Sequence, residues 1–251
     1  MGITGSIKKL WLVNLTATVA ALATWQAPAQ AFKFGTSGIQ FDFDTEVEFT
    51  FYQSRGAFQS TLKIFQVNTD NTLTWVKDLF AETRASDNWS ANGWLGTCGE
   101  GKTVQGSCSV SFTFLKGTMY TLGLDSGENG KVYSTSALNT AENGTLWLSE
   151  LSPAGSQQAV FGSFGSLGAD GTRFDNPQNF QSADPFAGLV KISFDDRGAR
   201  NALGIPDLDY QDFSVTAQAR PVASVPEPAT LGGLGLVGCA LAARRRQRSI
   251  T

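Results

Sequence analysis

The segment 193–213 concentrates the side chains of this chain that could do chemistry. It reads SFDDRGARNALGIPDLDYQDF and contains five aspartates: Asp195, Asp196, Asp207, Asp209 and Asp212. Carboxylate oxygens are the ligands that Ca²⁺ prefers, and the ion takes roughly six to eight of them in a flexible geometry. The spacing is not that of an EF-hand, because the required glycine and the distal glutamate are missing. A calcium site built from the five aspartates is therefore one prediction for this segment.

Two other interpretations of the acidic segment stay open. Arg197 and Arg200 lie among the aspartates and can pair with them, and aspartate also caps turns, so the cluster can be purely structural. Alternatively, two of the carboxylates could act as a catalytic pair, as they do in glycoside hydrolases. That third interpretation requires two acids to converge in a cleft, which a sequence does not reveal.

The composition excludes several other classes of site, because the chain contains no histidine. Ser-His-Asp and Cys-His nucleophiles need an imidazole near its working pKa. Most zinc sites also use histidine or clustered cysteine. Among catalytic chemistries, carboxylate chemistry remains possible. Our expectation is nevertheless that the protein is not an enzyme.

The charge distribution argues against nucleic acid as a partner. The formal net charge is −3, but six of the basic residues lie in the two terminal segments. Without those segments, 13 basic and 21 acidic residues remain, a net charge of −8. Such an acidic body binds polyanions poorly. It is compatible with cation binding and with simple solubility.

The first 31 residues have the organisation of a secretory signal peptide. Lys8 and Lys9 form the basic region, Leu10–Ala23 is the apolar region, and Ala29-Gln30-Ala31 is a cleavage site of the A-x-A type. We expect cleavage after Ala31. The alternative is an uncleaved membrane anchor, for which the apolar tract is short.

Export changes the interpretation of the three cysteines. Outside the cytoplasm, Cys98 and Cys108 are predicted to form a disulfide that closes a short glycine-rich loop. In the chain-entropy picture such a crosslink stabilises the fold by ~2–3 kcal/mol. Cys239 lies alone in a C-terminal apolar tract, where packing or lipidation would use it.

The body of the chain, residues 32–224, has the pattern of an all-β domain. Apolar and polar residues alternate strictly over Phe41–Phe51, which predicts a half-buried strand. The segment 75–83 fits either a short helix or a strand, and the glycine-rich stretches 87–106 and 155–179 predict loops. Further strands are predicted at 61–67, 72–76, 109–115, 118–124, 144–151, 188–194 and 213–219. Many short strands between turns indicate an antiparallel β-sandwich or jelly-roll-like domain.

The C-terminal segment 225–251 differs from the body in composition. Val225 is followed by Pro226-Glu227-Pro228, which fixes an extended and non-helical backbone. The uncharged tract 229–243 would span about 22 Å as a helix, less than a hydrocarbon core of about 30 Å. With some bilayer thinning it can still cross. The cluster Arg244, Arg245 and Arg246 would then keep the C-terminus in the cytoplasm.

This arrangement resembles the PEP-CTERM sorting signal of Gram-negative bacteria, cyanobacteria included. The resemblance covers the Val-Pro-Glu-Pro sequence at 225–228, the short helix and the arginines at 244–246, about 27 residues in all. It implies recognition and processing by a membrane protease-transpeptidase called exosortase. The protein would then reach the outer surface or the extracellular matrix, where such proteins often accompany exopolysaccharide genes. The resemblance says nothing about the body.

We therefore expect an exported surface or matrix protein without enzymatic activity. Its partners would be the export machinery, an exosortase-type enzyme and the membrane, through the C-terminal helix before processing. Its body would bind polysaccharide through exposed aromatic side chains, with Trp89 and Trp94 as candidates. A Ca²⁺-dependent adhesion or stability module and a carboxylate-based hydrolase are the alternatives.

Overall fold

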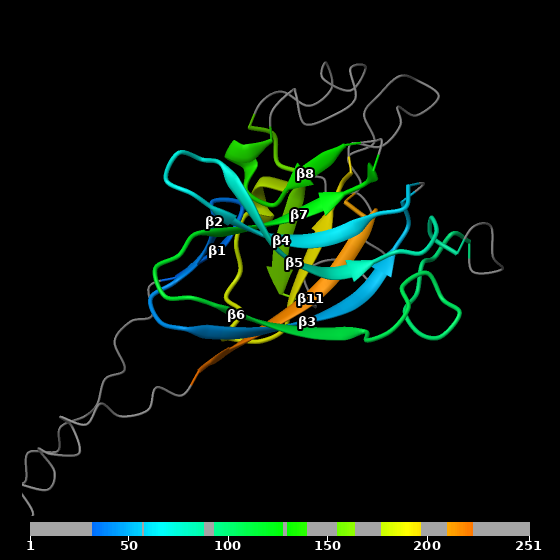
Figure 1. Cartoon of the computed structure of the whole chain (residues 1–251), viewed down its shortest axis with the longest axis horizontal. Helices are drawn as coiled ribbons and strands as arrows, with labels where there is room; N and C mark the ends of the chain where they lie inside the picture. The colour runs from blue at the N-terminus through cyan, green and yellow to red at the C-terminus, as the bar shows by residue number, and fades with distance from the viewer. Residues whose placement is uncertain are drawn as a thin grey trace, which may run out of the picture. The chain divides into compact units, whose positions relative to one another are not determined.

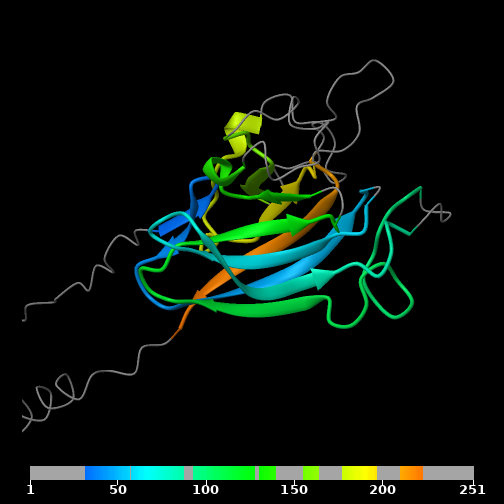
Figure 2. The same ribbon diagram turned by 45° about the horizontal axis from the view of Figure 1, so that its top comes forward.

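The computed structural model describes residues 32–56, 58–87, 93–127, 130–139, 155–163, 177–196 and 210–222. These ranges form two antiparallel β-sheets that pack against each other, as the two views in Figure 1 and Figure 2 show. The fold is a β-sandwich, as the sequence predicts. The signal peptide, the C-terminal segment and the predicted strand at 144–151 lie outside the described residues.

The first sheet has six strands, and we call it the six-stranded sheet. Its order is β1-β2-β7-β4-β5, and β8 pairs with β7 beside this path. The bounds are β1 Phe32–Gly35, β2 Gly38–Phe41, β4 Thr61–Val67, β5 Leu73–Ala81, β7 Tyr120–Asp125 and β8 Lys131–Tyr133.

The second sheet, the five-stranded sheet, has the order β6-β3-β11-β10-β9. It contains the longest strand, β3, and the two last strands of the described chain, β10 and β11. The bounds are β3 Thr45–Ser54, β6 Ser109–Phe114, β9 Ala159–Ser163, β10 Val190–Phe194 and β11 Phe213–Pro221. Two short 3₁₀ helices, η2 Ser136–Leu138 and η4 Pro177–Phe180, lie in the connections.

The core lies between the two sheets and is rich in phenylalanine. Along β3, Val47, Phe49 and Phe51 are buried. Glu46, the second residue of the strand, is exposed. Phe51 meets Phe213 of the neighbouring strand edge-to-face at 5.3 Å between ring centroids. Period-two burial of this kind is what the alternating sequence requires of a strand with one face on the core.

The predicted single strand over 41–51 is wrong in one respect, because the chain changes sheets within it. Phe41 ends β2 in the six-stranded sheet, and β3 of the five-stranded sheet begins at Thr45. Between them, the Asp44 Oδ1 accepts a hydrogen bond of 2.8 Å from the Lys116 backbone N–H. Asp42 and Asp44 therefore lie in a corner, whereas Glu46 and the polar residues after it belong to β3.

A second corner lies at Lys116-Gly117, where the sequence has a tight turn signal. The turn does form, with Gly117 at a φ of 71°, but β6 before it and β7 after it belong to different sheets. The Gly117 N–H donates to the Phe41 carbonyl at 2.8 Å, which ties the two corners together.

Three other predictions have clear outcomes. The strand at 61–67 is confirmed as β4, and the two last predicted strands form the antiparallel pair β10 and β11. The undecided segment 75–83 is mostly strand, as part of β5. The predicted loop 155–179 is wrong in part, because it contains β9.

The sandwich is closed differently on its two sides. On one side the edge strands are β5 and β6, and the Lys77 Nζ reaches across to donate to the Ser111 carbonyl at 3.0 Å. On the other side, the segment before β10 bridges to β1 through the pairing of Gly35 with Ser182. A lysine aimed between the sheets also protects an edge strand from pairing with another chain.

Within the described ranges, no helix is long and apolar enough to cross a bilayer. The short C-terminal helix predicted from the sequence lies outside those ranges.

Candidate functional site

The described part of the acidic segment forms the base of the β10–β11 hairpin. Asp195 and Asp196 follow β10 directly and are buried, and Asp212 precedes β11. The Asp212 Oδ2 accepts a hydrogen bond of 2.8 Å from the Asp196 backbone N–H. The Asp212 carbonyl accepts two more, from the N–H groups of Arg55 at 3.2 Å and Gly56 at 3.3 Å. Asp212 therefore holds the hairpin against the end of β3.

The remaining members of the predicted calcium cluster, Asp207 and Asp209, lie outside the described residues, as do Arg197 and Arg200. Within the residues that are described, no group of three or more Asp, Glu, Cys or His side chains is arranged to hold a metal ion. The calcium site stays a prediction.

Tyr210 also belongs to this hairpin, although the sequence did not single it out. Its ring packs with Val160 on the outer side of the five-stranded sheet, and its hydroxyl donates to the Gln157 carbonyl at 3.1 Å. Burial, and to a smaller extent the charge of Asp195, raise the pKa of Tyr210 above its ordinary value. The tyrosine is thus a neutral packing residue.

A second polar cluster lies where β3 and β5 end, around the buried Glu82. The Ser54 Oγ donates to Glu82 Oε1 at 2.5 Å, and the Ser60 backbone N–H donates to Glu82 Oε2 at 2.8 Å. Burial outweighs these two hydrogen bonds and raises the pKa of Glu82 to about 7. Ser86 extends the cluster, because its Oγ donates to the Gly56 carbonyl at 3.1 Å.

The Glu82 cluster has a protonatable acid and a hydroxyl in contact, but it is not arranged for catalysis. Ser54 and Ser86 are fully buried, so neither hydroxyl is open to a substrate. Gly96 packs against Ser54 so closely that an added Cβ would lie 2.0 Å from the serine Oγ. The cluster is therefore a structural junction. No local sequence pattern indicates this junction, because its members are distant in the chain.

The predicted disulfide is present next to this junction. Cys98 and Cys108 are bonded, with their Cα atoms 5.7 Å apart. Val104, inside the loop that the disulfide closes, is buried in the core and pairs with Glu82 in an isolated β-bridge. The crosslink thus fixes a loop that covers the end of the sandwich.

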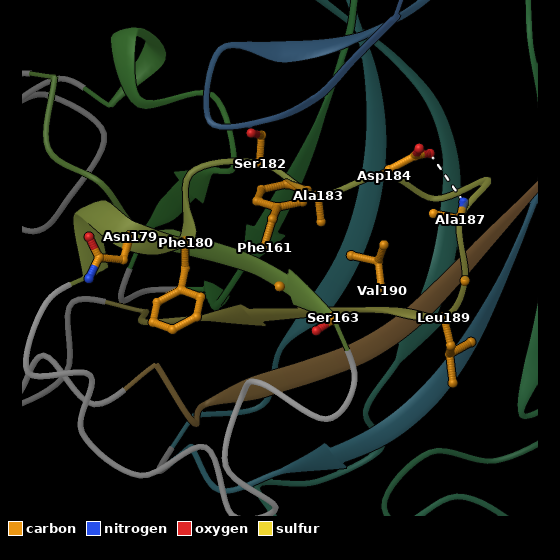
Figure 3. A pocket seen from close by; sticks show the side chains of 12 residues that line it. Phe161, Ser163, Asn179, Phe180, Ser182, Ala183, Asp184, Ala187, Leu189 and Val190 are labelled. Atoms are coloured by element: carbon orange, nitrogen blue, oxygen red, sulfur yellow. Dashed lines mark hydrogen bonds between the residues drawn. The ribbon is translucent and has the colours of Figure 1, made fainter. Parts of the chain in front are cut away.

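A pocket of about 360 Å³ opens beside β9, and Figure 3 shows the side chains around it. It is lined by the end of β9, by η4 and by the segment that leads into β10. Asn179 and Phe180 lie at one end and Asp184 and Ala187 at the other (Figure 3). The Asp184 Oδ1 accepts hydrogen bonds from the N–H groups of Phe186 at 2.8 Å and Ala187 at 3.3 Å.

The chemistry available in this pocket is limited. Among its described lining residues, Asp184 is the single ionisable one, and it caps the turn beside it. Two converging carboxylates, which the hydrolase alternative requires, are not found among them. Part of the pocket, at 161–163 and Asn179, lies in the segment that the sequence predicted to be a loop, and part, at 188–190, lies in a predicted strand. The sequence singled out none of the lining residues as functional.

Aromatic side chains gather instead on the outer face of the six-stranded sheet. Trp75 of β5 lies opposite Phe65 of β4 in the strand register, and Phe65 packs edge-to-face on Tyr133 of β8 at 5.7 Å. The indole of Trp75 is 59% exposed and its Nε1 donates to Asp78 Oδ1 at 2.8 Å. Of the two tryptophans that the sequence suggested, Trp94 is half-buried rather than exposed, and Trp89 lies outside the described residues.

Comparison with known proteins gives one match. Residues 224–246 match the PEP-CTERM protein-sorting motif. No curated protein and no solved structure was found to match the chain. The matched range contains Val225, Pro226, Glu227, Pro228 and the arginines at 244–246, the residues on which the resemblance rests. The chain is accordingly a PEP-CTERM domain-containing protein.

Proposed function

We propose that the chain is a non-enzymatic protein of the cell surface or extracellular matrix, delivered there by an exosortase-type enzyme and associated with polysaccharide. The observation that carries the proposal is the sorting motif at 224–246. It follows directly on a body that the N-terminal signal would export, so the two terminal segments act in sequence. The first directs the chain across the membrane, and the second directs its release or attachment.

The chemistry of the tail supports this order of events. A proline restricts its own backbone and that of the residue before it, so Pro226 and Pro228 would leave this segment extended and accessible to a membrane protease. If the tract 229–243 crosses the membrane as predicted, the arginines at 244–246 would hold its far end in the cytoplasm. The body then faces outward and stays anchored until the tail is processed.

The non-enzymatic part of the proposal is supported by how the described acids are used. Glu82 joins strand ends, Asp184 caps a turn and Asp212 holds a hairpin. Each of these roles is structural, and none places an acid beside an open cleft with a second one.

A localisation experiment tests the proposal. The full chain is expressed in a bacterium with an exosortase-type enzyme, beside a variant with Pro226, Glu227 and Pro228 replaced by alanine. We expect wild-type protein at the surface, and the variant retained in the inner membrane with its tail intact. Pro221→Ala, upstream of the motif, is the matched control and should behave as wild type.

Surface protein is measured by protease accessibility in intact cells and by fractionation. If the triple-alanine variant reaches the surface in the same amount as wild type, the proposed sorting route is wrong.

A further inference from the structure

We propose that the outer face of the six-stranded sheet binds a neutral polysaccharide, with the indole of Trp75 as the surface on which a sugar ring stacks. The inference rests on the proposed polysaccharide association and assigns it a site. It assigns the stacking role to Trp75 of β5, whereas the sequence had suggested Trp89 and Trp94 as candidates.

The side chains of this face are identified by alternation along the strands. Leu62 and Ile64 of β4 and Leu122 of β7 belong to the core, so Phe65 and Gly123 on the same strands point outward. Trp75 lies opposite Phe65, and Tyr133 lies opposite Gly123. The three aromatic residues and the glycine therefore share one face of four neighbouring strands.

Gly123 makes the aromatic cluster possible. A Cβ at this position would lie 2.7 Å from Phe65 Cε2 and 3.1 Å from Tyr133 Cδ1. Without a side chain on β7, the two rings meet above the strand, and each is only 8% exposed. Phe65 and Tyr133 are thus a packed aromatic pair on β4 and β8, next to Trp75 in the strand register.

Trp75 is the most exposed large hydrophobic side chain of the described residues. Its indole is also fixed, because its ring nitrogen donates to the carboxylate of Asp78. A flat aromatic ring that is held in place before binding loses little conformational entropy when a ligand stacks on it. Exposure combined with fixation is what a stacking surface needs.

The polar neighbours of the aromatic cluster suit hydroxyl groups. Asp78 lies opposite Lys63, and the Lys63 Nζ is 2.8 Å from Asp125 Oδ2. Lys131 reaches the same oxygen at 3.3 Å. Carboxylates and ammonium groups thus alternate along one edge of the cluster, and their charges largely compensate. They offer both acceptors and donors without a strong field of one sign.

The charge of the body decides which ligand fits. Its net charge of −8 disfavours an anionic chain. A sugar ring has an apolar carbon–hydrogen face and hydroxyl groups at its edge, which matches an aromatic surface with mixed polar neighbours. A protein partner would require a larger continuous apolar area than Trp75 and its neighbours leave exposed. A neutral polysaccharide is therefore the occupant that this face favours.

Affinity electrophoresis of the exported full chain tests the site. Native gels contain hydroxyethyl cellulose, laminarin, dextran or the anionic polysaccharide alginate, and the retardation gives a dissociation constant. We expect retardation by at least one neutral polysaccharide, and none by alginate. Trp75→Ala should weaken that binding at least tenfold, whereas Trp75→Phe, which keeps a flat ring, should retain most of it.

Leu115→Ala is the matched control, because Leu115 is 54% exposed and lies at the corner between β6 and β7. Its binding should equal that of wild type, and circular dichroism checks that every variant is folded. If wild type and Trp75→Ala are retarded equally, the assignment of the binding site to Trp75 is wrong, whereas the proposed binding of polysaccharide is retained. If no gel retards wild type, the polysaccharide part of the proposed function fails as well. Retardation by alginate alone contradicts the neutral ligand.

Discussion

The Ser54 Oγ donates a hydrogen bond of 2.5 Å to the buried carboxylate of Glu82, and this contact joins the two sheets. Ser54 ends β3 of the five-stranded sheet, and Glu82 follows β5 of the six-stranded sheet. The Ser60 backbone N–H satisfies the second carboxylate oxygen. One acidic side chain thus links three strand ends, and its protonation state bears on the stability of the sandwich.

We expect the stability of the protein to fall as Glu82 ionises. Burial raises the pKa of Glu82 from 4.5 to about 7, so the folded protein binds this proton more tightly than the unfolded chain. The resulting stabilisation is complete below pH 4.5 and is lost as the pH rises through 7. Its full size is about 3 kcal/mol at 1.36 kcal/mol per pKa unit. Urea unfolding at pH 5 and pH 8 measures it.

Glu82→Gln isolates this effect from the other titrations. The amide keeps a donor and an acceptor for Ser54 and Ser60 but does not ionise. The variant should gain stability relative to wild type at pH 8 and not at pH 5. Glu100→Gln, at an exposed position, is the control and should follow wild type at both values. If the free energy of unfolding of wild type and of Glu82→Gln changes equally between pH 5 and pH 8, Glu82 is not the group responsible.

Removal of the disulfide should lower the free energy of unfolding by about 2–3 kcal/mol. The crosslink closes a separation of 10 residues between Cys98 and Cys108, and the loop carries Val104 into the core. The double variant with serine at both positions, compared with oxidised wild type in urea, measures the loss. Equal unfolding midpoints would mean that the loop is held by its packing alone.

Gly35→Ala should destabilise the fold by about 2–3 kcal/mol through overpacking. An added Cβ would lie 2.1 Å from the Gln181 carbonyl oxygen and 2.8 Å from the Ser182 Cα, so backbone rather than a side chain must shift. Gly188→Ala is the matched control, because nothing lies within 4 Å of its added Cβ. The melting temperatures of the two variants are compared by thermal unfolding. Equal melting temperatures would contradict the close approach of Gly35 to the backbone at 181–182.

The calcium alternative for the acidic segment has its own test. If the five aspartates hold Ca²⁺, saturation at 100 times the dissociation constant adds about 2.7 kcal/mol of stability. For a body of this size the melting temperature would rise by about 5–10 °C. Asp196→Asn should reduce that rise. An identical melt in calcium and in chelator removes this alternative and leaves the hairpin contacts of Asp212 as the role of the segment.

Local patterns were sufficient for the strands whose apolar and polar residues alternate in the sequence. β4 and the β10–β11 pair follow from alternation and flanking turn residues alone, although all five residues of β10 are buried. β9 was missed because apolar residues lie on both of its faces: Phe161 faces the core, and Val160 packs against Tyr210 outside it. A strand without a polar face does not alternate, and its glycine-rich neighbours indicate a loop.

The assignment of strands to sheets needed the three-dimensional structure. The corners at Asp44 and Lys116 resemble a strand interior and a hairpin turn in the sequence, but both carry the chain from one sheet to the other. The candidate sites also depend on long-range contacts. Glu82 accepts hydrogen bonds from serines 22 and 28 residues away, and Trp75 is exposed on the outer face of β5, which is an edge strand.

We propose that residues 224–251, and not the β-sandwich, direct the chain to the cell surface. The most direct test of this proposal is to measure the surface-accessible fraction of two exported proteins in a host with an exosortase-type enzyme. One is an unrelated exported reporter fused to residues 224–251, and the other is this chain without those residues. We expect the reporter to reach the surface and the truncated chain to stay inside. A reporter that stays inside, together with a truncated chain that still reaches the surface, would contradict it.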